Sequence, residues 1–302
     1  MFKNSHRLSI EGSIISISNV IYEIDTQQGL AKLHHRTPDS TGPPVLFIHG
    51  FGSNAEIWFA YDDSLGNYFK VNHMDCWALN LSNAVTGNIK TLAHEDVLTA
   101  VDFIYKECNQ AVLIVCHSMG GIISRYFTSP YVDHPYPLKT IVQMIRAIVL
   151  LTVPNHGVDA GDISRIEETV NVLRNFLTDD QEPLAADLGL GFFQLTRNSK
   201  LLQSLNTLPP LNPNLKWLNA VGTYDKVVPR NSALFEEFEF SNLPKFSQQE
   251  FPCDHMVYPF TSTISKVIKA IPQFIESAKH VIKIYPAIHR YEPVGNWILN
   301  QI

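Results

Sequence analysis

Three residues whose side chains can together perform nucleophilic catalysis stand far apart in the chain: Ser118, Asp225 and His255. A serine hydroxyl is a weak nucleophile until a histidine takes its proton and an acid holds that histidine in the correct tautomer. Because all three follow apolar runs that are typical of strands, the ends of those strands can bring them together. The sequence therefore predicts Ser118 as a nucleophile, His255 as its base and Asp225 as the orienting acid.

The surroundings of Ser118 favour this interpretation. In "VLIVCHSMGGIISRYF" an apolar run precedes the serine and a helical pattern follows it. A serine at such a strand-to-helix turn lies at a helix N-terminus, where main-chain N–H groups and the helix dipole stabilise an oxyanion. Gly120 and Gly121 remove side chains that would collide with neighbouring elements. The motif reads C-H-S-M-G against the general G-x-S-x-G, so Cys116 places a side chain where the pattern favours none. The alternative is a serine that only caps the helix.

Other residues compete for the acid and nucleophile roles. Asp225 follows an apolar strand in "NAVGTYDKVVPRNS", and His255 lies in "EFPCDHMVYP" after another expected strand. Asp254 is adjacent to His255, but neighbouring side chains of an extended segment point apart. Asp162 is a second alternative acid. Cys116 is a remote alternative nucleophile, because it lies within the strand before the turn.

An oxyanion hole needs two N–H donors. The residue after the nucleophile, Met119, supplies one, and the glycine-containing turn in "LFIHGFGSNAEIW" offers the N–H of Phe51 as the second. We expect His49 to fix this turn rather than to take part in chemistry. The "GFG" lacks the third glycine of a dinucleotide loop and the lysine of a phosphate-binding loop, so no nucleotide cofactor is indicated.

Strand-like runs alternate with helical patterns through most of the chain. The runs cover residues 13–25, 44–50, 74–82, 111–117, 147–153, 215–222 and 246–255. Between them, residues 91–107 have a helical stripe made of Leu92, Val97, Ala100, Val101 and Ile104. Alternation of this kind predicts an α/β fold with a mainly parallel sheet, helices on both faces and an antiparallel edge formed by the first strands.

The alternation is interrupted at residues 158–214. This segment is too long for an ordinary loop and contains its own helical spacing, so we predict a helical cap inserted in a single domain that covers 1–302. An ordinary crossover helix followed by a disordered loop is the alternative. Several apolar residues of this insertion can line an acyl pocket or pack the cap on the body: Phe192, Phe193, Leu195, Leu201 and Leu202.

Composition excludes several classes of function. The 302 residues are 45% hydrophobic and 17% charged, which is typical of a globular protein. A net charge of -6 provides no basic field for nucleic acid.

The chain has neither a conventional signal peptide nor a segment long enough to cross a bilayer, which predicts a cytoplasmic protein, with non-classical export left open. The spacing of His, Cys and acidic residues indicates no metal site, and the four cysteines are expected to be reduced.

The sequence resembles the α/β-hydrolase superfamily, and within it bacterial triacylglycerol lipases and GPI inositol-deacylase-like hydrolases. The stretches that carry the resemblance are "VLFIHGFGSN", "CHSMGGIISRYF", "LLTVPNHG", "SKLLQSLN" and "GTYDKVVP" with the later "DHMVYP". The order Ser118, Asp225, His255 is that of the superfamily. The cap motif S-x-x-L-x-x-L-N is matched by Ser199, Leu202, Leu205 and Asn206. A partial match to T-P-H-x-G-T covers Val153, Pro154, Asn155, His156 and Gly157.

The resemblance implies hydrolysis of an apolar acyl ester through an acyl-enzyme, with a small-molecule or lipid ester as substrate and transient contact with a membrane surface. A departure from the family pattern is "NLSNAVTGN", which stands where many relatives carry D-x-R-G-x-G. A thioesterase or acyltransferase would use the same triad. A catalytically silent ligand-binding module of the same fold is the alternative of a different class.

Overall fold

The computed structural model describes residues 3–6, 19–159, 190–255 and 286–302. These residues form one nine-stranded sheet in the order β1-β2-β3-β5-β4-β6-β7-β8-β9. The strands are β1 Lys3–His6, β2 Val20–Thr26, β3 Gly29–His35, β4 Pro44–Ile48, β5 Asp75–Asn80, β6 Val112–His117, β7 Ile145–Leu151, β8 Trp217–Gly222 and β9 Phe246–Phe251.

The sheet is mainly parallel, as the sequence predicts. Strands β1, β2, β3 and β5 pair antiparallel, whereas every pairing among β4 to β9 is parallel. The apolar runs become the central strands because both of their faces are covered, and β4 and β6 are buried at every position. Strand β3 is not indicated by an apolar run, because its buried positions include His34 and His35.

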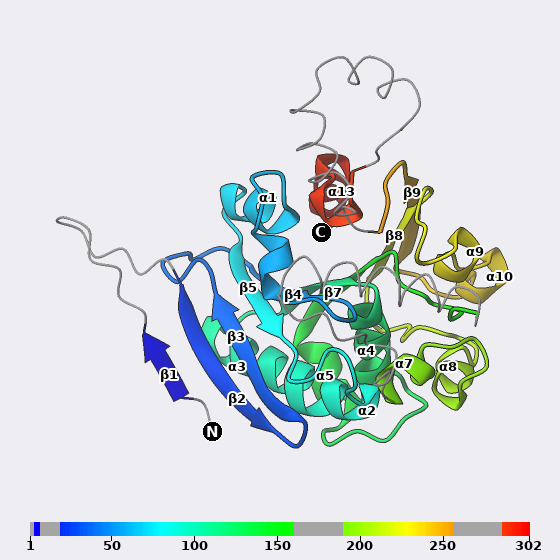
Figure 1. Ribbon diagram of the computed structural model, residues 1–302, viewed down its shortest axis with the longest axis horizontal. Coiled ribbons are helices and arrows are strands. Elements are labelled where there is room, and N and C mark those ends of the chain that lie inside the picture. Colours follow the sequence, from blue (N-terminus) through cyan, green and yellow to red (C-terminus); the bar gives the residue numbers. More distant parts are fainter. Residues whose placement is uncertain (1–2, 7–18, 160–189, 256–285) are drawn as a thin grey trace, which may run out of the picture.

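Helices cover both faces of this sheet (Figure 1). The helices before the strand β7 are α1 Leu65–Val71, α2 Ile89–Thr91, α3 Leu98–Cys108, α4 Met119–Thr128 and α5 Leu138–Gln143, with the short 3-10 helix η1 Ala55–Trp58. Those after it are α7 Leu190–Gln194, α8 Lys200–Leu205, α9 Arg230–Ala233, α10 Glu237–Phe240, the 3-10 helix η4 Ile288–Arg290 and α13 Glu292–Gln301. Helices α1 and α13 pack together on one face, and α3, α4 and α5 lie on the other (Figure 1).

The two faces bury different halves of each strand. In β4, Val45 and Phe47 belong to the core under α1 and α13, whereas Leu46 and Ile48 belong to the core under α3 and α4. This alternation is the period of two that a strand imposes on its side chains. Because helices bury both faces of the sheet, a site can form only in the loops that connect its strands.

The predicted helix over 91–107 is present, but its first part is wider than an α-helix. Residues Leu92–Val97 form a π-helix that leads into α3. The predicted apolar stripe is buried against the sheet, and its members are Leu92, Val97, Ala100, Val101 and Ile104. Wide turns of this kind are rare and often lie near functional sites.

The strand order reverses at β4. From β4 the chain passes to β5 on one side and then to β6 on the other. In open α/β sheets, ligands bind at the carboxyl ends of the strands where the strand order reverses. Phe51 follows β4 and Ser118 follows β6, so two predicted site residues lie at this point.

The predicted cap at 158–214 falls largely outside the described residues, so it stays a prediction. Within its described part, α7 and α8 lie beside α4 (Figure 1). Leu195 and Leu202 are buried in the core shared with α3 and α4, and Leu201 packs against it, whereas Phe193 is 57% exposed. The structure does not describe the side chain of Phe192. The buried leucines therefore pack this segment on the body.

The four cysteines are all free thiols. Among the described helices, none combines the length and the hydropathy that a membrane-spanning helix requires.

Candidate active site

Ser118 occupies the turn between β6 and α4 with a backbone φ of 53°. This left-handed region is costly for a residue other than glycine, and such strain clusters at functional sites. Its main-chain N–H donates to Leu151 O at 3.1 Å, and Gly121 N–H donates to Ser118 O at 2.9 Å. The turn is thus fixed to the neighbouring strand and to the first turn of its own helix.

Two glycines make this turn sterically possible. A Cβ at Gly120 would stand 2.7 Å from His49 O, and one at Gly121 would stand 2.1 Å from a methyl carbon of Val153. Both distances are far below ordinary contact, so side chains are excluded here. The close approach lets α4 begin against the carboxyl ends of β4 and β7, as the sequence predicts for these glycines.

Cys116 is accommodated inside the sheet. Its thiol is buried and donates to Val149 O at an Sγ–O distance of 3.0 Å. Burial raises the pKa of this thiol to about 12, so the thiolate needed for nucleophilic attack does not form near neutral pH. The departure from the glycine of the general motif therefore leaves the turn at Ser118 intact, and the geometry does not favour Cys116 as a nucleophile.

Asp225 and His255 form a buried pair at the carboxyl ends of β8 and β9. Asp225 Oδ2 lies 2.7 Å from His255 Nδ1, and their side chains are 0% and 4% exposed. The other carboxylate oxygen, Oδ1, accepts from the N–H groups of Val227 and Val228 at 2.8 and 2.7 Å. A carboxylate held in this way has only acceptors to offer, so the imidazole carries its proton on Nδ1 and keeps the lone pair on Nε2. That is the tautomer of a general base.

The alternative acid Asp254 is directed to the main chain. Its Oδ1 accepts from His255 N–H at 2.8 Å and from Lys226 N–H at 3.2 Å. The carboxylate thus ties the loop after β9 to the loop after β8, and Asp225 is the acid that meets the imidazole. The other alternative, Asp162, lies outside the described residues.

The loop of Ser118 and the loop of His255 are in contact. His117, the residue before Ser118, has its ring centroid 4.3 Å from that of His255. A Cβ built on Gly50 would stand 2.8 Å from Ser118 Cβ, so the turn after β4 meets the same point. The structure therefore brings three of the predicted segments together, those that carry Phe51, Ser118 and His255.

His49 holds the turn that carries Phe51. Its Nδ1 donates to Gly50 O at 2.8 Å, and its Nε2 accepts from Leu81 N–H at 3.2 Å. Burial lowers the pKa of His49 to about 4, which keeps the ring neutral and allows one nitrogen to accept. This arrangement agrees with the expected structural role of His49. Met119 is the first residue of α4, where N–H groups have no partner within a helix.

Asp96 supports the same region from the π-helix, and sequence reasoning missed it. Its carboxylate accepts from Ser82 N–H at 2.6 Å and from Ser82 Oγ at 3.1 Å. Ala84 O, two residues later, accepts from Gly52 N–H at 3.1 Å, so the "NLSNAVTGN" loop in turn braces the turn after β4. Burial raises the pKa of Asp96 to about 6. The available signal was an acidic residue among the apolar positions of 91–107.

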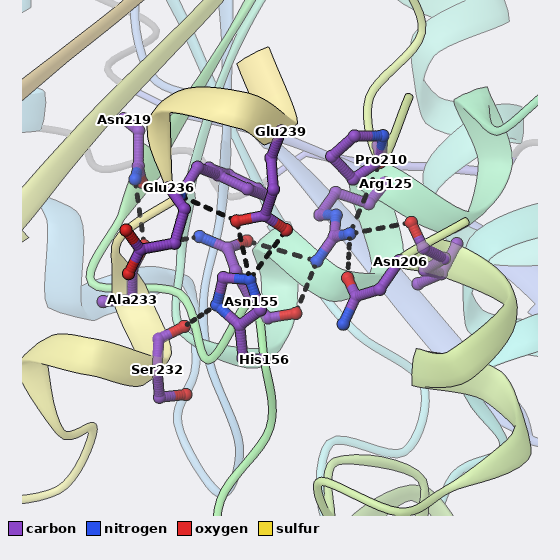
Figure 2. A network of polar contacts seen from close by, with 12 residues as sticks. Arg125, Asn155, His156, Asn206, Pro210, Asn219, Ser232, Ala233, Glu236 and Glu239 are labelled. Atoms are coloured by element: carbon purple, nitrogen blue, oxygen red, sulfur yellow. Dashed lines mark hydrogen bonds and ion pairs between the residues drawn. The ribbon is translucent and has the colours of Figure 1, made fainter. Parts of the chain in front are cut away.

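Arg125 is fully buried two turns along α4 from Ser118. Figure 2 shows its guanidinium between the loop after β7 and the segment after α8. It donates to Asn155 O at 2.9 Å, to Asn206 Oδ1 at 2.7 Å and to Leu205 O at 3.0 Å, and more weakly to Pro210 O at 3.3 Å. The helix that follows Ser118 is thereby fastened to the described end of the predicted cap.

The motif residues of that segment now have structural roles. Ser199 caps α8 by accepting from Leu202 N–H at 3.2 Å, and Asn206 is a ligand of the guanidinium. His156 Nε2 lies 2.9 Å from Glu239 Oε1, and the main-chain N–H of His156 donates to Ser232 O at 3.0 Å (Figure 2). These contacts attach the loop after β7 to α9 and α10. They lie around the hydrogen bonds of Arg125 and help to hold the loop after β7 in place.

No group of three or more His, Cys, Asp or Glu side chains within the described ranges is arranged to hold a metal ion. The described residues bring a hydroxyl, an imidazole, a carboxylate and main-chain N–H groups to the site.

Comparison with known proteins places this geometry in a family. The sequence profile of the Alpha/beta hydrolase family matches residues 45–263. A curated relative, a pimeloyl-(acyl-carrier protein) methyl ester esterase of Aeromonas hydrophila, is 20% identical over an aligned length of 271, and the alignment covers 80% of this chain and 96% of the relative. The profile covers well over half of the chain, so the chain belongs to the alpha/beta hydrolase family.

Solved structures share the fold at low sequence identity. An esterase of Pyrococcus furiosus is 12% identical with a TM-score of 0.53, and covers 86% of this chain and 92% of its own. A serine hydrolase of Cycloclasticus zankles is 16% identical with a TM-score of 0.51, and covers 87% and 99%. Family membership therefore rests on the sequence profile, and these structures agree with it in fold.

Proposed function

We propose that this member of the alpha/beta hydrolase family is a serine hydrolase of carboxylic esters, with Ser118 as nucleophile, His255 as general base and acid, and Asp225 as the acid that orients His255. The observation that carries the proposal is the buried 2.7 Å contact between His255 Nδ1 and Asp225, next to a strained serine turn. Such an arrangement leaves His255 Nε2 as the acceptor for a hydroxyl proton.

The reaction follows from these roles. Ser118 Oγ attacks the ester carbonyl carbon while His255 Nε2 takes the hydroxyl proton. The resulting oxyanion accepts hydrogen bonds from the N–H groups of Phe51 and Met119. Collapse breaks the bond to the alcohol oxygen, which receives the proton from His255. A water molecule then attacks the acyl-enzyme, His255 takes its proton, and the proton returns to Ser118 Oγ as the acid leaves.

The substrate class follows from the chemistry and the relatives together. A serine hydroxyl activated by an imidazole attacks carbonyl carbons, and the Aeromonas hydrophila relative is named for a methyl ester. We therefore propose a carboxylic ester bond as the target. Hydrolysis rates on p-nitrophenyl esters of increasing acyl length measure which acyl group the enzyme prefers.

A fluorophosphonate probe tests the assignment of the nucleophile. The wild type should be labelled and should hydrolyse p-nitrophenyl esters, and Ser118→Ala should lose both. Ser124→Ala is the matched control, because Ser124 lies on the same helix and its hydroxyl donates to Gly120 O at 2.9 Å. This control should be labelled like the wild type. Labelling that persists in a folded Ser118→Ala would refute the proposal.

A further inference from the structure

His117 is the one imidazole that packs on the ring of His255 from the strand that carries Ser118. It is the last residue of β6 and is 2% exposed. The planes of the two rings are inclined by 46° with their centroids 4.3 Å apart, which is van der Waals contact. The ring of His289 lies 5.7 Å from that of His117, centroid to centroid. His117 is thus near both the proposed base and η4.

The ring nitrogens of His117 are poorly bonded. Neither has a hydrogen-bond partner of good geometry among the residues that the structure describes, although a polar contact with the main chain of His255 favours the protonated ring. A Cβ on Gly50 would stand 3.3 Å from its Nδ1, so the main chain after β4 closes that side of the ring. Buried polar atoms without partners are rare and costly, and they call for a reason. The packing of this ring against the ring of His255 supplies such a reason.

The charge state fits a packing role. Burial first, and then the neighbouring rings of His255 and His289, hold the pKa of His117 well below its ordinary value. Burial also lowers the pKa of His289 to about 3. Both rings are therefore neutral near pH 7, and neither opposes the positive charge that His255 acquires during the reaction.

A hydrogen bond alone does not fix the orientation of His255. The contact between Nδ1 and Asp225 Oδ2 holds one atom of the ring, and the ring can still swing about the line that joins these two atoms. The direction of Nε2 then stays undefined. A rigid ring packed against one face removes this freedom, because swinging toward it would produce a clash.

Resting on the proposed function, we infer that His117 is a positioning residue: its neutral ring packs on His255 and aims Nε2 at Ser118. The residue acts through His255 and takes no part in proton transfer. Misplacing a reacting group by about 1 Å costs on the order of 100-fold in rate. His117→Ala should therefore lower kcat by about 10- to 100-fold, and KM should change little because the contact is not with substrate.

Three variants separate shape from polarity. His117→Phe keeps a flat ring and removes the unpaired nitrogens, so it should retain most of kcat and raise the thermal midpoint. His117→Gln keeps polar atoms without a rigid ring and should lose kcat as the alanine variant does. His117→Leu is apolar but has no flat ring, so it should lose kcat as the alanine variant does. His134→Ala is the matched control, since His134 lies away from the site and bonds to Ser129 O at 2.6 Å.

The measurement is kcat per active site, counted by fluorophosphonate titration well below each thermal midpoint, so that loss of folded protein does not enter. The proton between His255 Nδ1 and Asp225 gives a second readout by NMR, and its resonance should broaden in His117→Ala and persist in His117→Phe. Full kcat in His117→Ala, or rescue by glutamine and not by phenylalanine, overturns the inference. A wild type that is neither labelled nor active overturns instead the proposed function.

Discussion

The contact between Gly121 and Val153 allows a sharp test of how the nucleophile turn is packed. A Cβ at position 121 would stand 2.1 and 2.8 Å from the two methyl carbons of Val153 and 3.0 Å from its Cβ. Ordinary van der Waals contact begins at 3.4 Å, so the first contact is too short by more than a rearrangement of a few tenths of an ångström can relieve. Gly121→Ala must therefore displace either Val153 or the start of α4.

The free energies follow from the atoms involved. Overpacking of a well-packed core costs about 1–3 kcal/mol, so Gly121→Ala should lower the free energy of unfolding by about that amount. Val153→Ala alone creates a small cavity and should cost about 1–2 kcal/mol. In the double variant both close methyl groups are gone and only the contact at 3.0 Å remains. The double variant should therefore be about 1–2 kcal/mol more stable than the sum of the single costs implies.

Urea unfolding of the four proteins measures this coupling. Gly120→Ala is the matched control, because its Cβ would meet the main-chain oxygens of His49 and Ile48 at 2.7 and 2.8 Å. No truncation of a side chain can relieve that contact, so Val153→Ala should leave the cost of Gly120→Ala unchanged. Additive costs for Gly121→Ala and Val153→Ala would show that the steric reasoning is wrong.

Three further predictions concern the buried charged groups. Asp225→Asn should lower kcat by about 10³- to 10⁴-fold. The neighbouring Asp254→Asn keeps the contact between Asp225 and the imidazole, so it should change kcat much less. Both values are measured by steady-state kinetics, and equal losses would argue against Asp225. Arg125→Met leaves several buried carbonyl oxygens without a donor, so it should lower the free energy of unfolding by about 3–5 kcal/mol. Urea unfolding measures this loss, and a value under about 1 kcal/mol would contradict the anchoring role. The pKa of Asp96 is raised to about 6 from an ordinary 3.8, so the folded state binds this proton more tightly than the unfolded state does. The free energy of unfolding should therefore fall by about 2–3 kcal/mol as pH rises from about 4 to about 6. In Asp96→Asn this part of the pH dependence should vanish, and an unchanged profile in urea unfolding would refute it.

Much of the fold was predictable because strand and helix periods are local properties. The runs from 44–50 to 246–255 became β4 to β9, since apolar residues on both faces of a strand have no other stable place. Strand β3 was less visible, because His34 and His35 are buried there by tertiary contacts. His35 is an example: its Nε2 lies 2.6 Å from Asp75 and its ring stacks on Trp77.

Sequence motifs predict the candidate site residues, but they do not predict the contacts between distant loops. The pairing of Asp225 with His255 depends on a chain order that the sequence displays, whereas the contact of His117 with His255 depends on where two loops meet. Asp96 and Arg125 could not be found from spacing, because their partners Ser82 and Asn206 belong to other elements. Long-range polar contacts of this kind carry no periodic signal.

Ser118 and the Asp225–His255 pair follow different strands, so a cut in the chain can separate the proposed nucleophile from its proposed base. A break between β7 and β8 would place Ser118 on one fragment and both Asp225 and His255 on the other. Strands β7 and β8 are held by main-chain hydrogen bonds along their length, so the two fragments have a matching edge through which to reassociate. On the proposed chemistry each half by itself is inert, and ester turnover would report the reunion of the two halves.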